Sequence, residues 1–566
     1  MRLIAAGIAA LIVLAWFGKW AFIPGQNVPR HRVRHHRIRV RLHLHPGRGH
    51  ATAFECWLRW GRLASFRESS RTRPGLGFAD RALNADAHSI LLGRAHYAMR
   101  LRIDTQTHVA VISPPRKGKS AWLARVINHY PGPVVSTTTK ADIFGLTSGL
   151  RSRRGPIHVF SPQNIGYVPS TFRWNPIEGC QDAATAIRRA DMFSQSVSQK
   201  GVDDGTFWSQ MAGEWLRAMF QAAALAGLSM LHVQAWTLTG NAQQAENILA
   251  AHGRYEAAAS LAQMKFDAKK TTQTIQMTLA RSLAFLADPM LAASVLPAEG
   301  DGLDIEEFLH SGGTLYMIAE SRNQESPLAP LFACLANEIH YTAALIGSQS
   351  DGGRLDPSLL MALDEVTQIC PIPLPSWLAD SGGKGIQIIA VCHGEAQLRS
   401  RWGSDGARVI FDTSGVKLYL PGITDPDTLS TASKLCGQTA YREHGEAEKY
   451  SRHDVMTIDM VSRLPKWRAL ALQGGHAPVI VKLGRAWKDP AYRLAKFQGR
   501  AIAVVTAAAE PPAINRPVFG AMPAADPAAI EPEAADSTSP AEVPAEAPEL
   551  EPAAAETNGA SYPWRR

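Results

Sequence analysis

The sequence predicts an α/β protein whose mostly parallel sheet is interrupted by an all-α insertion. Short aliphatic and β-branched runs alternate with amphipathic helices in two parts of the chain, as expected of βαβ units. Between these parts, residues 181–300 show almost only helical periodicity. Two apolar runs that are far apart in the sequence end in residues suited to contact phosphate or a metal ion. We therefore expect one sheet domain, a helical domain inserted into it, and a functional site at the edge of the sheet.

The first 24 residues have the pattern of a membrane anchor. Residues 3–17 are apolar or small, and residues 20–23 resume after Lys19, which gives about the 20 residues that a spanning helix needs. A cleaved signal peptide is the alternative, but no small-residue cleavage site follows. Residues 30–41 are instead rich in arginine and histidine, a charge load that resists translocation. We expect one uncleaved helix in the plasma or inner membrane, with the bulk of the chain in the cytoplasm.

Charge is distributed unevenly along the 566 residues, whose formal net charge is +9. The basic segment of residues 25–87 is expected to fix the topology and contact anionic lipid, and nucleic-acid binding is the alternative. Residues 506–566 are rich in Ala, Pro and Glu and have few large apolar side chains, so we expect a disordered acidic tail, either a tether or a docking segment. The six cysteines form no CxxC pair, as expected of reduced thiols.

Between the termini we expect a sheet domain in two parts, residues 88–180 and 301–505, with the helical domain of residues 181–300 between them. Strands are predicted at residues 109–112, 133–137, 157–160, 314–318, 359–363, 386–391, 416–420 and 478–481, the last as an edge strand. Helices are predicted at residues 54–71, 121–128, 206–227, 242–251, 271–286 and 328–345.

The strand at residues 109–112 leads into a candidate phosphate-binding loop, SPPRKGKS, which ends at Ser120. The loop matches the G-x-x-x-x-G-K-[ST] pattern, except that Ser113 replaces the first glycine. It also lies between a predicted strand and a predicted helix, as this pattern requires. Backbone N–H groups at the start of the helix would hold phosphates, Lys119 would reach the β- and γ-phosphates, and the Ser120 hydroxyl would ligate Mg²⁺. An ordinary turn with a surface lysine is the alternative. The predicted nucleotide-binding residues of the loop are Pro115, Arg116, Lys117, Gly118, Lys119 and Ser120.

The strand at residues 359–363 ends in Asp364 and Glu365, at the position where open α/β sheets bind ligands. Asp364 would hold Mg²⁺ through water, and Glu365 would orient and deprotonate the attacking water. With the upstream loop, these acids predict hydrolysis of ATP with Mg²⁺, in which Lys119 and Glu365 are catalytic. His393, after the strand at residues 386–391, is a candidate sensor of the γ-phosphate, with Gln397 one helical turn further on. A structural histidine is the alternative.

The order of these segments resembles the conjugative coupling proteins of the TraG/TraD kind, which are membrane-anchored ATPases of type IV secretion. LLMALDEV at residues 359–366 and GKGIQIIAVCHGEAQLRSRWG at residues 383–403 are the most specific segments, and the likeness extends over residues 91–437. The resemblance implies a RecA-like P-loop ATPase core, a projecting all-α domain and a homo-hexamer at the membrane. It also implies ATP-driven transfer of single-stranded DNA or a relaxase–DNA complex, in contact with components of the type IV secretion channel.

The chain departs from the family pattern at three places. Ser113 stands at the first loop position, and His393 stands where glutamine is usual. A trans-acting arginine is expected shortly before residue 386, and Lys384, Arg399 and Arg401 are the candidates for that charge. Two other functions stay open: a double-stranded DNA translocase of the FtsK type, and a nucleotide-binding membrane scaffold that recruits substrate without hydrolysis.

Overall fold

The computed structural model describes residues 49–509, except for residues 96–97, 198–204, 264–268, 299, 322–325, 351 and 443–449. The expected membrane anchor, the arginine-rich run of residues 30–41 and nearly all of the expected acidic tail lie outside the described residues. Within the described part of the chain, no helix has the length and apolarity needed to cross a membrane.

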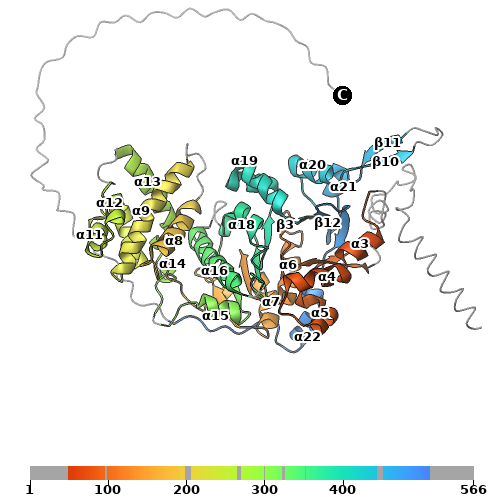
Figure 1. Ribbon diagram of the computed structural model, residues 1–566, viewed down its shortest axis with the longest axis horizontal. Coiled ribbons are helices and arrows are strands. Elements are labelled where there is room, and N and C mark those ends of the chain that lie inside the picture. The colour runs from red at the N-terminus through yellow and green to blue at the C-terminus, as the bar shows by residue number, and fades with distance from the viewer. Residues whose placement is uncertain are drawn as a thin grey trace, which may run out of the picture. The chain divides into compact units, whose positions relative to one another are not determined.

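An eleven-stranded mixed sheet forms the centre of the fold (Figure 1). Its strands are β1 (Ser89–Arg94), β2 (Arg100–Asp104), β3 (Val109–Ile112), β4 (Val134–Thr138), β5 (Ile157–Phe160), β6 (Thr314–Ile318), β7 (Leu359–Leu363), β8 (Ile386–Cys392), β9 (Val416–Tyr419), β12 (Arg468–Gln473) and β13 (Val479–Lys482). They are arranged in the order β2-β1-β13-β12-β9-β3-β8-β7-β4-β6-β5. Neighbours are parallel from β9 to β5 and antiparallel from β2 to β9. The prediction of an α/β fold with a mostly parallel sheet is confirmed.

Each face of the sheet has its own hydrophobic core, because successive side chains of a strand point to opposite faces. In β3, Val109 and Val111 face one core, and Ala110 and Ile112 face the other. Both faces are covered, which explains why the central strands are continuous apolar runs and lack polar alternation. Helices on the first face are α3 (Ala53–Trp60), α6 (Lys119–His129) and α7 (Asp142–Arg151). Those contributing to the second core include α16 (Ala329–Gln349), α17 (Val366–Ile369), α18 (Leu374–Asp380) and α19 (Glu395–Thr413).

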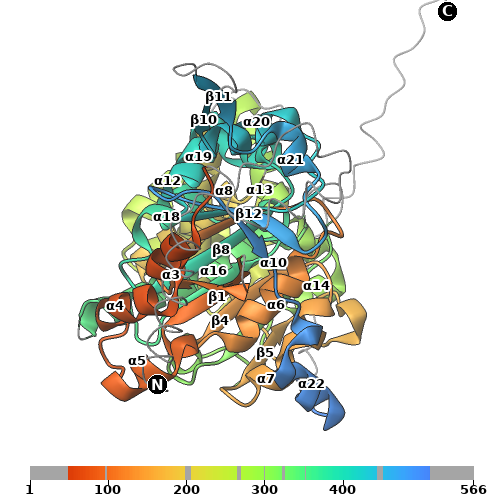
Figure 2. The same ribbon diagram turned by 90° about the vertical axis from the view of Figure 1, so that its right-hand side faces the viewer.

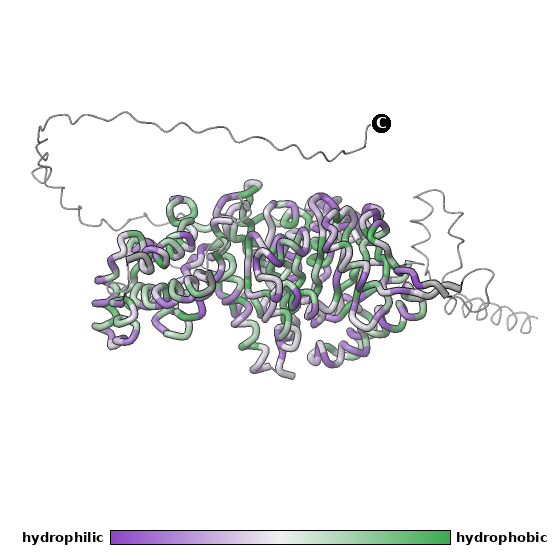
Figure 3. Tube along the Cα trace, turned by 90° about the horizontal axis from the view of Figure 1, so that it is seen from above, coloured by the Kyte–Doolittle hydropathy of each residue, from purple (hydrophilic) through white to green (hydrophobic). Residues whose placement is uncertain are grey.

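The described residues between positions 183 and 293 form helices joined by turns and contain no strand. The helices are α8 (Ala183–Gln195), α9 (Gly205–Leu225), α10 (Met230–Thr239), α11 (Gln243–Ala251), α12 (Tyr255–Gln263), α13 (Lys269–Ser282) and α14 (Pro289–Ala293), and α15 (Ile305–His310) follows them. Hydrophobic and hydrophilic stretches alternate along them (Figure 3). Helix α8 packs on α9 and also on α16, where Nε of Arg188 lies 2.7 Å from Oε1 of Glu338. This ion pair ties the helical region to the sheet.

Residues 51–87, expected in a separate basic segment, pack on the sheet. The expected helix at residues 54–71 is two helices, α3 and α4 (Arg62–Thr72), because Gly61 between them is extended at φ −82° and ψ 177°. Both helices contact β2, and α5 (Phe78–Leu83) follows them. Figure 2 shows α3 and α4 beside β1. The sheet domain thus begins before residue 88.

The expectation that residues 478–481 form an edge strand is wrong. Strand β13 lies between β12 and β1, because the β1–β2 hairpin adds two antiparallel strands beyond it. Strand β12 and a separate hairpin of β10 (Gln438–Arg442) and β11 (Tyr450–Asp454) were not predicted. The remaining helices of the second part are α20 (Pro426–Leu435), α21 (Ile458–Ser462) and α22 (Pro490–Phe497).

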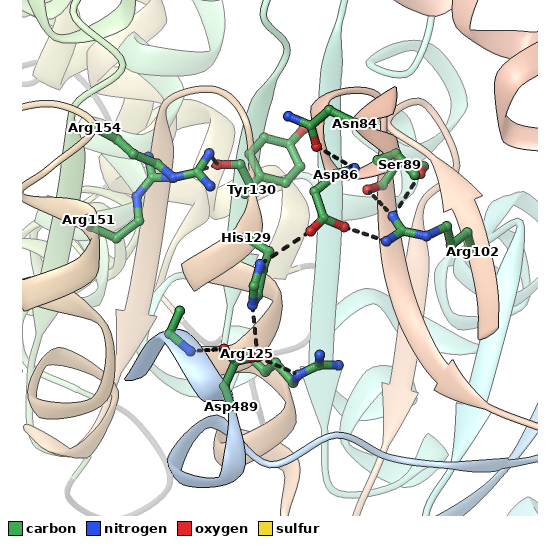
Figure 4. Close-up of polar contacts among 12 residues, drawn as sticks. Asn84, Asp86, Ser89, Arg102, Arg125, His129, Tyr130, Arg151, Arg154 and Asp489 are labelled. Atoms are coloured by element: carbon green, nitrogen blue, oxygen red, sulfur yellow. Dashed lines mark hydrogen bonds and ion pairs between the residues drawn. The ribbon is translucent and has the colours of Figure 1, made fainter. Parts of the chain in front are cut away.

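A charged network fixes the carboxyl end of α6 (Figure 4). The ring of His129 lies between two carboxylates, with Nε2 2.8 Å from Oδ2 of Asp489 and Nδ1 3.4 Å from Oδ2 of Asp86. Arg102 of β2 pairs with Asp86, and Arg125 Nε lies 3.1 Å from Asp489 Oδ2. Hydrogen bonds that the His129 ring donates to the carboxylates of Asp489 and Asp86 raise the pKa of His129 to about 9 despite its burial. The network links the segment before β1, helix α6 and the start of α22.

Candidate active site

Three neighbouring parallel strands deliver the candidate site residues to one edge of the sheet. Strands β3, β8 and β7 are adjacent in that order. Because the carboxyl ends of parallel strands meet at the same edge, the loop after β3, His393 after β8, and Asp364 and Glu365 after β7 come together. The fold therefore brings together groups that the sequence holds some 250 positions apart, as predicted.

The phosphate-binding loop ends at Gly118, directly before α6 begins at Lys119. Gly118 has φ 102° and Arg116 has φ 62°, so the loop makes two left-handed steps. Glycine adopts this conformation without steric cost. No side chain caps the helix at Gly118, and the first N–H groups of a helix have no partner within it. Pro115 and Arg116 are exposed at the tip, and Lys117 is half-buried. The free helix start is suited to bind an anion.

Lys119 makes the central contacts of the site. Its ammonium nitrogen lies 2.8 Å from Oε1 of Glu365 and 3.1 Å from Oδ1 of Asp364, and the residue is only 8% exposed. Burial by itself lowers the pKa of Lys119, but the charges of Asp364 and then Glu365 raise it, and the net pKa lies above its ordinary value. Lys119 therefore stays charged, and the alternative of an ordinary surface lysine does not apply.

Asp364 is a buried carboxylate, 3% exposed, whose pKa is raised first by burial, lowered by Lys119 and raised again by Glu365. Its Oδ2 lies 3.4 Å from the hydroxyl of Ser120. Its Oδ1 is within ion-pair distance of Lys119 but has no aligned hydrogen-bond donor, so it keeps a lone pair for another partner.

The hydroxyl of Ser120 and the carboxylate of Asp364 fit Mg²⁺, which proteins usually bind through one or two carboxylates together with phosphate oxygens and water. Among the described residues, no group of three or more His, Cys, Asp or Glu side chains could hold a metal ion by itself. Ser120 and Asp364 would therefore hold Mg²⁺ only in company with a phosphate group.

Glu365, directly before α17, has the left-handed conformation, at φ 54° and ψ 45°. A residue with a Cβ pays roughly 1–2 kcal/mol for this conformation. Such strain is typical of functional positions, where the surrounding structure enforces it. In this conformation the carboxylate of Glu365 meets Lys119 beside the loop.

His393 lies between the two halves of the site. Its Nδ1 is 3.1 Å from the carbonyl oxygen of Ser113, and its Nε2 is 3.7 Å from Oε1 of Glu365. The backbone N–H of His393 donates to Oε1 of Gln397 over 2.9 Å. Gln397 therefore holds the turn after β8, and His393 is in contact with both the loop and the candidate catalytic acid.

The three candidates for a trans-acting cation lie at different places. Lys384 precedes β8, at the sheet edge opposite the site, and pairs with Asp380. Arg399 pairs with Glu395 and Asp427, each at 3.1 Å. The candidate nearest the helical region is Arg401, which donates to the carbonyl oxygens of Gln195 and Ser196 after α8.

Sequence reasoning missed two residues at this edge. Asp142, at the start of α7 after β4, raises the pKa of Asp364, and the charge of Lys119 in turn lowers the pKa of Asp142. Burial raises the pKa of Asp142 itself. The signal available in the sequence was an acid a few residues after a buried strand, the same signal that identified Asp364. Trp467, which packs on Gly118, had no such signal.

Residues 358–466 match the family model described as the "TraM recognition site of TraD and TraG". This segment begins at β7 and includes Asp364, Glu365 and His393. The bacterial conjugative coupling protein TrwBdeltaN70, in its unbound monoclinic form, has a similar fold with a TM-score of 0.52 and 19% identity, over 72% of this chain and 91% of that chain. The resemblance to the TraG/TraD-like coupling proteins is confirmed.

Two further solved structures have a similar fold, with TM-scores and sequence identities close to those of the first. The plasmid coupling protein TrwB in complex with the GTP analogue GDPNP matches with a TM-score of 0.50 and 19% identity, over 68% of this chain and 88% of that chain. Its complex with the ATP analogue ADPNP matches with a TM-score of 0.50 and 18% identity, over the same shares. No curated protein matches the sequence.

Proposed function

We propose that this chain is a membrane-anchored ATPase that couples ATP hydrolysis to the transfer of DNA or a protein–DNA substrate through a type IV secretion or conjugation channel. The observation that carries the proposal is the approach of the Lys119 ammonium to Glu365 and Asp364, at 2.8 and 3.1 Å. The similarity to TraD and TraG and the fold shared with TrwB, a plasmid coupling protein solved with nucleotide analogues, support it.

Binding of the nucleotide exchanges the partners of Lys119. Without nucleotide, Lys119 forms ion pairs with Glu365 and Asp364. A triphosphate at the start of α6 offers Lys119 a stronger anionic partner, and the departure of Lys119 leaves the Glu365 carboxylate free to accept a proton from the attacking water. Ser120 and Asp364 would hold Mg²⁺ together with the phosphates, and the ion would supply positive charge to the reacting phosphate oxygens. The resting ion pair thus occupies the general base, Glu365, until substrate arrives.

His393 and Gln397 connect this exchange to the rest of the domain. His393 contacts Ser113 of the loop and Glu365, and Gln397 of α19 accepts from the backbone of His393. A change in the position of Glu365 is therefore passed to the start of α19. Through Arg401, α19 contacts the end of α8 in the helical region. This chain of contacts is a route from hydrolysis to domain movement.

The membrane and assembly parts of the proposal rest on sequence pattern. Residues 3–23 have the length and apolarity of a single spanning helix, and the basic residues 30–41 favour the cytoplasm for the bulk of the chain. A homo-hexamer at the plasma or inner membrane would surround single-stranded DNA or a relaxase–DNA complex and deliver it to the channel components.

A nucleotide-binding scaffold without turnover is the second candidate. It is favoured by the engagement of Lys384, Arg399 and Arg401, each of which has partners within its own chain. An arginine finger must be free to reach the neighbouring subunit's phosphates.

Steady-state ATP hydrolysis by the full chain in detergent micelles, with single-stranded or duplex DNA, separates the candidates. The proposal predicts Mg²⁺-dependent hydrolysis stimulated by single strands and abolished by Lys119→Ala, with Lys434→Ala as a control at an exposed lysine of α20. ATP binding without hydrolysis by the assembled protein would select the scaffold. A strong preference for duplex would select an FtsK-type translocase.

A further inference from the structure

An aromatic side chain from a distant segment packs against the phosphate-binding loop. Trp467 precedes β12, which is antiparallel to β9, so its position is at the same edge of the sheet as the loop after β3. Strands β12 and β9 lie on one side of β3, whereas β8 and β7, with Asp364, lie on the other. Trp467 is therefore beside the loop on the side away from the candidate Mg²⁺ ligands.

The contact between Trp467 and the loop is direct. A Cβ atom added to Gly118 would lie 2.5 Å from Cζ3 and 3.0 Å from Cε3 of Trp467, which is closer than atoms can pack. The indole ring therefore occupies the space where a side chain of residue 118 would stand. Only glycine allows this approach, and the ring lies next to the residue before Lys119.

Two cations and a second tryptophan surround the ring. The guanidinium carbon of Arg485 lies 4.9 Å from the Trp467 ring centroid, and Nζ of Lys466 lies 5.7 Å from it. Trp487 meets Trp467 edge-to-face at 5.5 Å and is 41% exposed. Among the described residues, neither Lys466 nor Arg485 forms an ion pair with a carboxylate. The cluster therefore offers aromatic surface and uncompensated positive charge beside the loop.

The backbone at Trp467 is strained, with φ 69° at a residue that has a bulky side chain. That conformation is unfavourable for any residue with a Cβ atom. It is held by the hydrogen bond that the N–H of Leu483 donates to the Trp467 carbonyl oxygen at 2.9 Å. Trp467 is strained and partly exposed, so packing in the hydrophobic core does not explain why the strain is kept. Strain of this kind is typical of functional positions.

We propose that Trp467, with Arg485 and Lys466, forms the platform for the base and the adjoining ribose-phosphate of the nucleotide whose terminal phosphates the loop holds. The inference rests on the proposed function and deepens it. An aromatic ring can stack on any base. Cations beside the indole are attracted to its face and can also pair with a phosphate of the ligand. Because stacking depends little on base identity, the platform distinguishes a nucleoside triphosphate from a bare polyphosphate and accepts adenine and guanine alike. The contact of Trp467 with Gly118 favours this ligand over a nucleic-acid strand.

The test compares the affinity of the full chain, in detergent micelles, for three magnesium-loaded ligands: ATP, GTP and tripolyphosphate. Trp467→Ala is expected to weaken ATP and GTP by about 5- to 150-fold, the equivalent of a stacking contribution of about 1–3 kcal/mol. Tripolyphosphate is expected to lose less than about threefold, and Trp467→Phe is expected to restore most of the ATP affinity. Trp57→Ala, at a half-exposed tryptophan of α3, is the matched control.

Three results would overturn the platform. Equal losses for ATP and tripolyphosphate would mean that Trp467 only shapes the loop. Unchanged nucleotide affinity would exclude stacking, and if single-stranded DNA affinity fell at the same time, the cluster would belong to a nucleic-acid surface. If the wild-type chain bound neither ATP nor tripolyphosphate, the proposed function itself would fail, and this outcome is distinct from failure of the platform alone.

Discussion

The ammonium nitrogen of Lys119 lies 2.8 Å from Oε1 of Glu365, although 246 positions separate the two residues in the sequence. Both side chains are largely buried, and Asp364 joins the pair from the same turn. A buried ion pair of this kind is costly to break, because the charge that remains has neither water nor a partner. The same three groups therefore determine both the stability of the nucleotide-free site and its chemistry.

The first prediction concerns stability without nucleotide. Lys119→Ala leaves Asp364 and Glu365 buried without their cation, and we expect it to destabilise the domain by about 3–5 kcal/mol. The cost should be largest at neutral and alkaline pH. An acid whose folded pKa is raised, as that of Asp364 is by burial, destabilises the fold above its unfolded pKa, and protonation relieves the cost as pH falls. Denaturant unfolding at pH 5 and pH 8 measures this difference.

The double variant Lys119→Ala/Asp364→Asn tests the explanation. If uncompensated charge is the cause, removing one of the two carboxylates restores part of the lost stability, so the effects of the two substitutions do not add. Additive losses would contradict the account. Lys434→Ala, at an exposed lysine, should change stability by less than about 0.5 kcal/mol.

The second prediction separates binding from catalysis. Glu365→Gln keeps the size of the side chain but removes the base, so we expect the rate of ATP hydrolysis to fall by about 10²–10⁴-fold. Nucleotide affinity should stay the same or rise, because Lys119 no longer pairs with a competing carboxylate. Glu395→Gln, which removes a carboxylate that contacts Arg399 and Thr431 and leaves Arg399 its pair with Asp427, is the matched control. Hydrolysis at the wild-type rate in Glu365→Gln would exclude Glu365 as the general base.

The third prediction concerns His393. Because His393 contacts both Ser113 and Glu365, we expect His393→Ala to lower kcat by about tenfold with little change in KM, and His393→Gln, the family's usual residue, to retain most activity. Steady-state kinetics with ATP measures both constants. A rise in KM at constant kcat would instead mean that His393 only supports substrate binding.

The fourth prediction is a pH dependence far from the site, in the network of Figure 4. Hydrogen bonds donated by the His129 ring to the carboxylates of Asp489 and Asp86 raise its pKa to about 9 from an unfolded value of 6.5. The stabilisation is therefore fully present below pH 6.5 and is lost as pH rises through 9. Relative to wild type, His129→Gln should lose about 1–3 kcal/mol at pH 6 and almost nothing at pH 10, as measured by denaturant unfolding.

An exposed histidine of α11 gives the comparison. His252→Gln should show no such pH-dependent difference, because His252 lies on the surface and its Nδ1 contacts the carbonyl oxygen of Ile248, at 2.8 Å, whereas His129 contacts two carboxylates. A constant difference between wild type and His129→Gln from pH 6 to pH 10 would mean that His129 is neutral in the folded protein.

The parallel half of the fold was predictable because its strands are short, continuous apolar runs. Residues 157–160, 314–318 and 359–363 were placed with the bounds that the structure has. The antiparallel half was not. Strand β12, RALALQ, alternates with small alanines and lacks β-branched residues, and the β10–β11 hairpin is polar. Because neither β12 nor the β1–β2 hairpin was recognised as its neighbour, β13 looked like an edge.

The candidate site residues that closely follow an apolar strand in the sequence could be predicted. They are Lys119, Asp364, Glu365 and His393. Trp467 could not be found in this way, because its place beside Gly118 depends on the strand order β12-β9-β3, which joins segments about 350 positions apart. Spatial neighbours created by antiparallel strands added late in the chain have no local sequence signal.

The most direct test of the central claim is a structure of the full chain with Mg²⁺ and a non-hydrolysable ATP analogue. The account predicts that the Lys119 ammonium leaves Glu365 for the β- and γ-phosphates and that Mg²⁺ lies between the Ser120 hydroxyl and Asp364. An analogue bound elsewhere, with the Lys119–Glu365 pair intact, would contradict it.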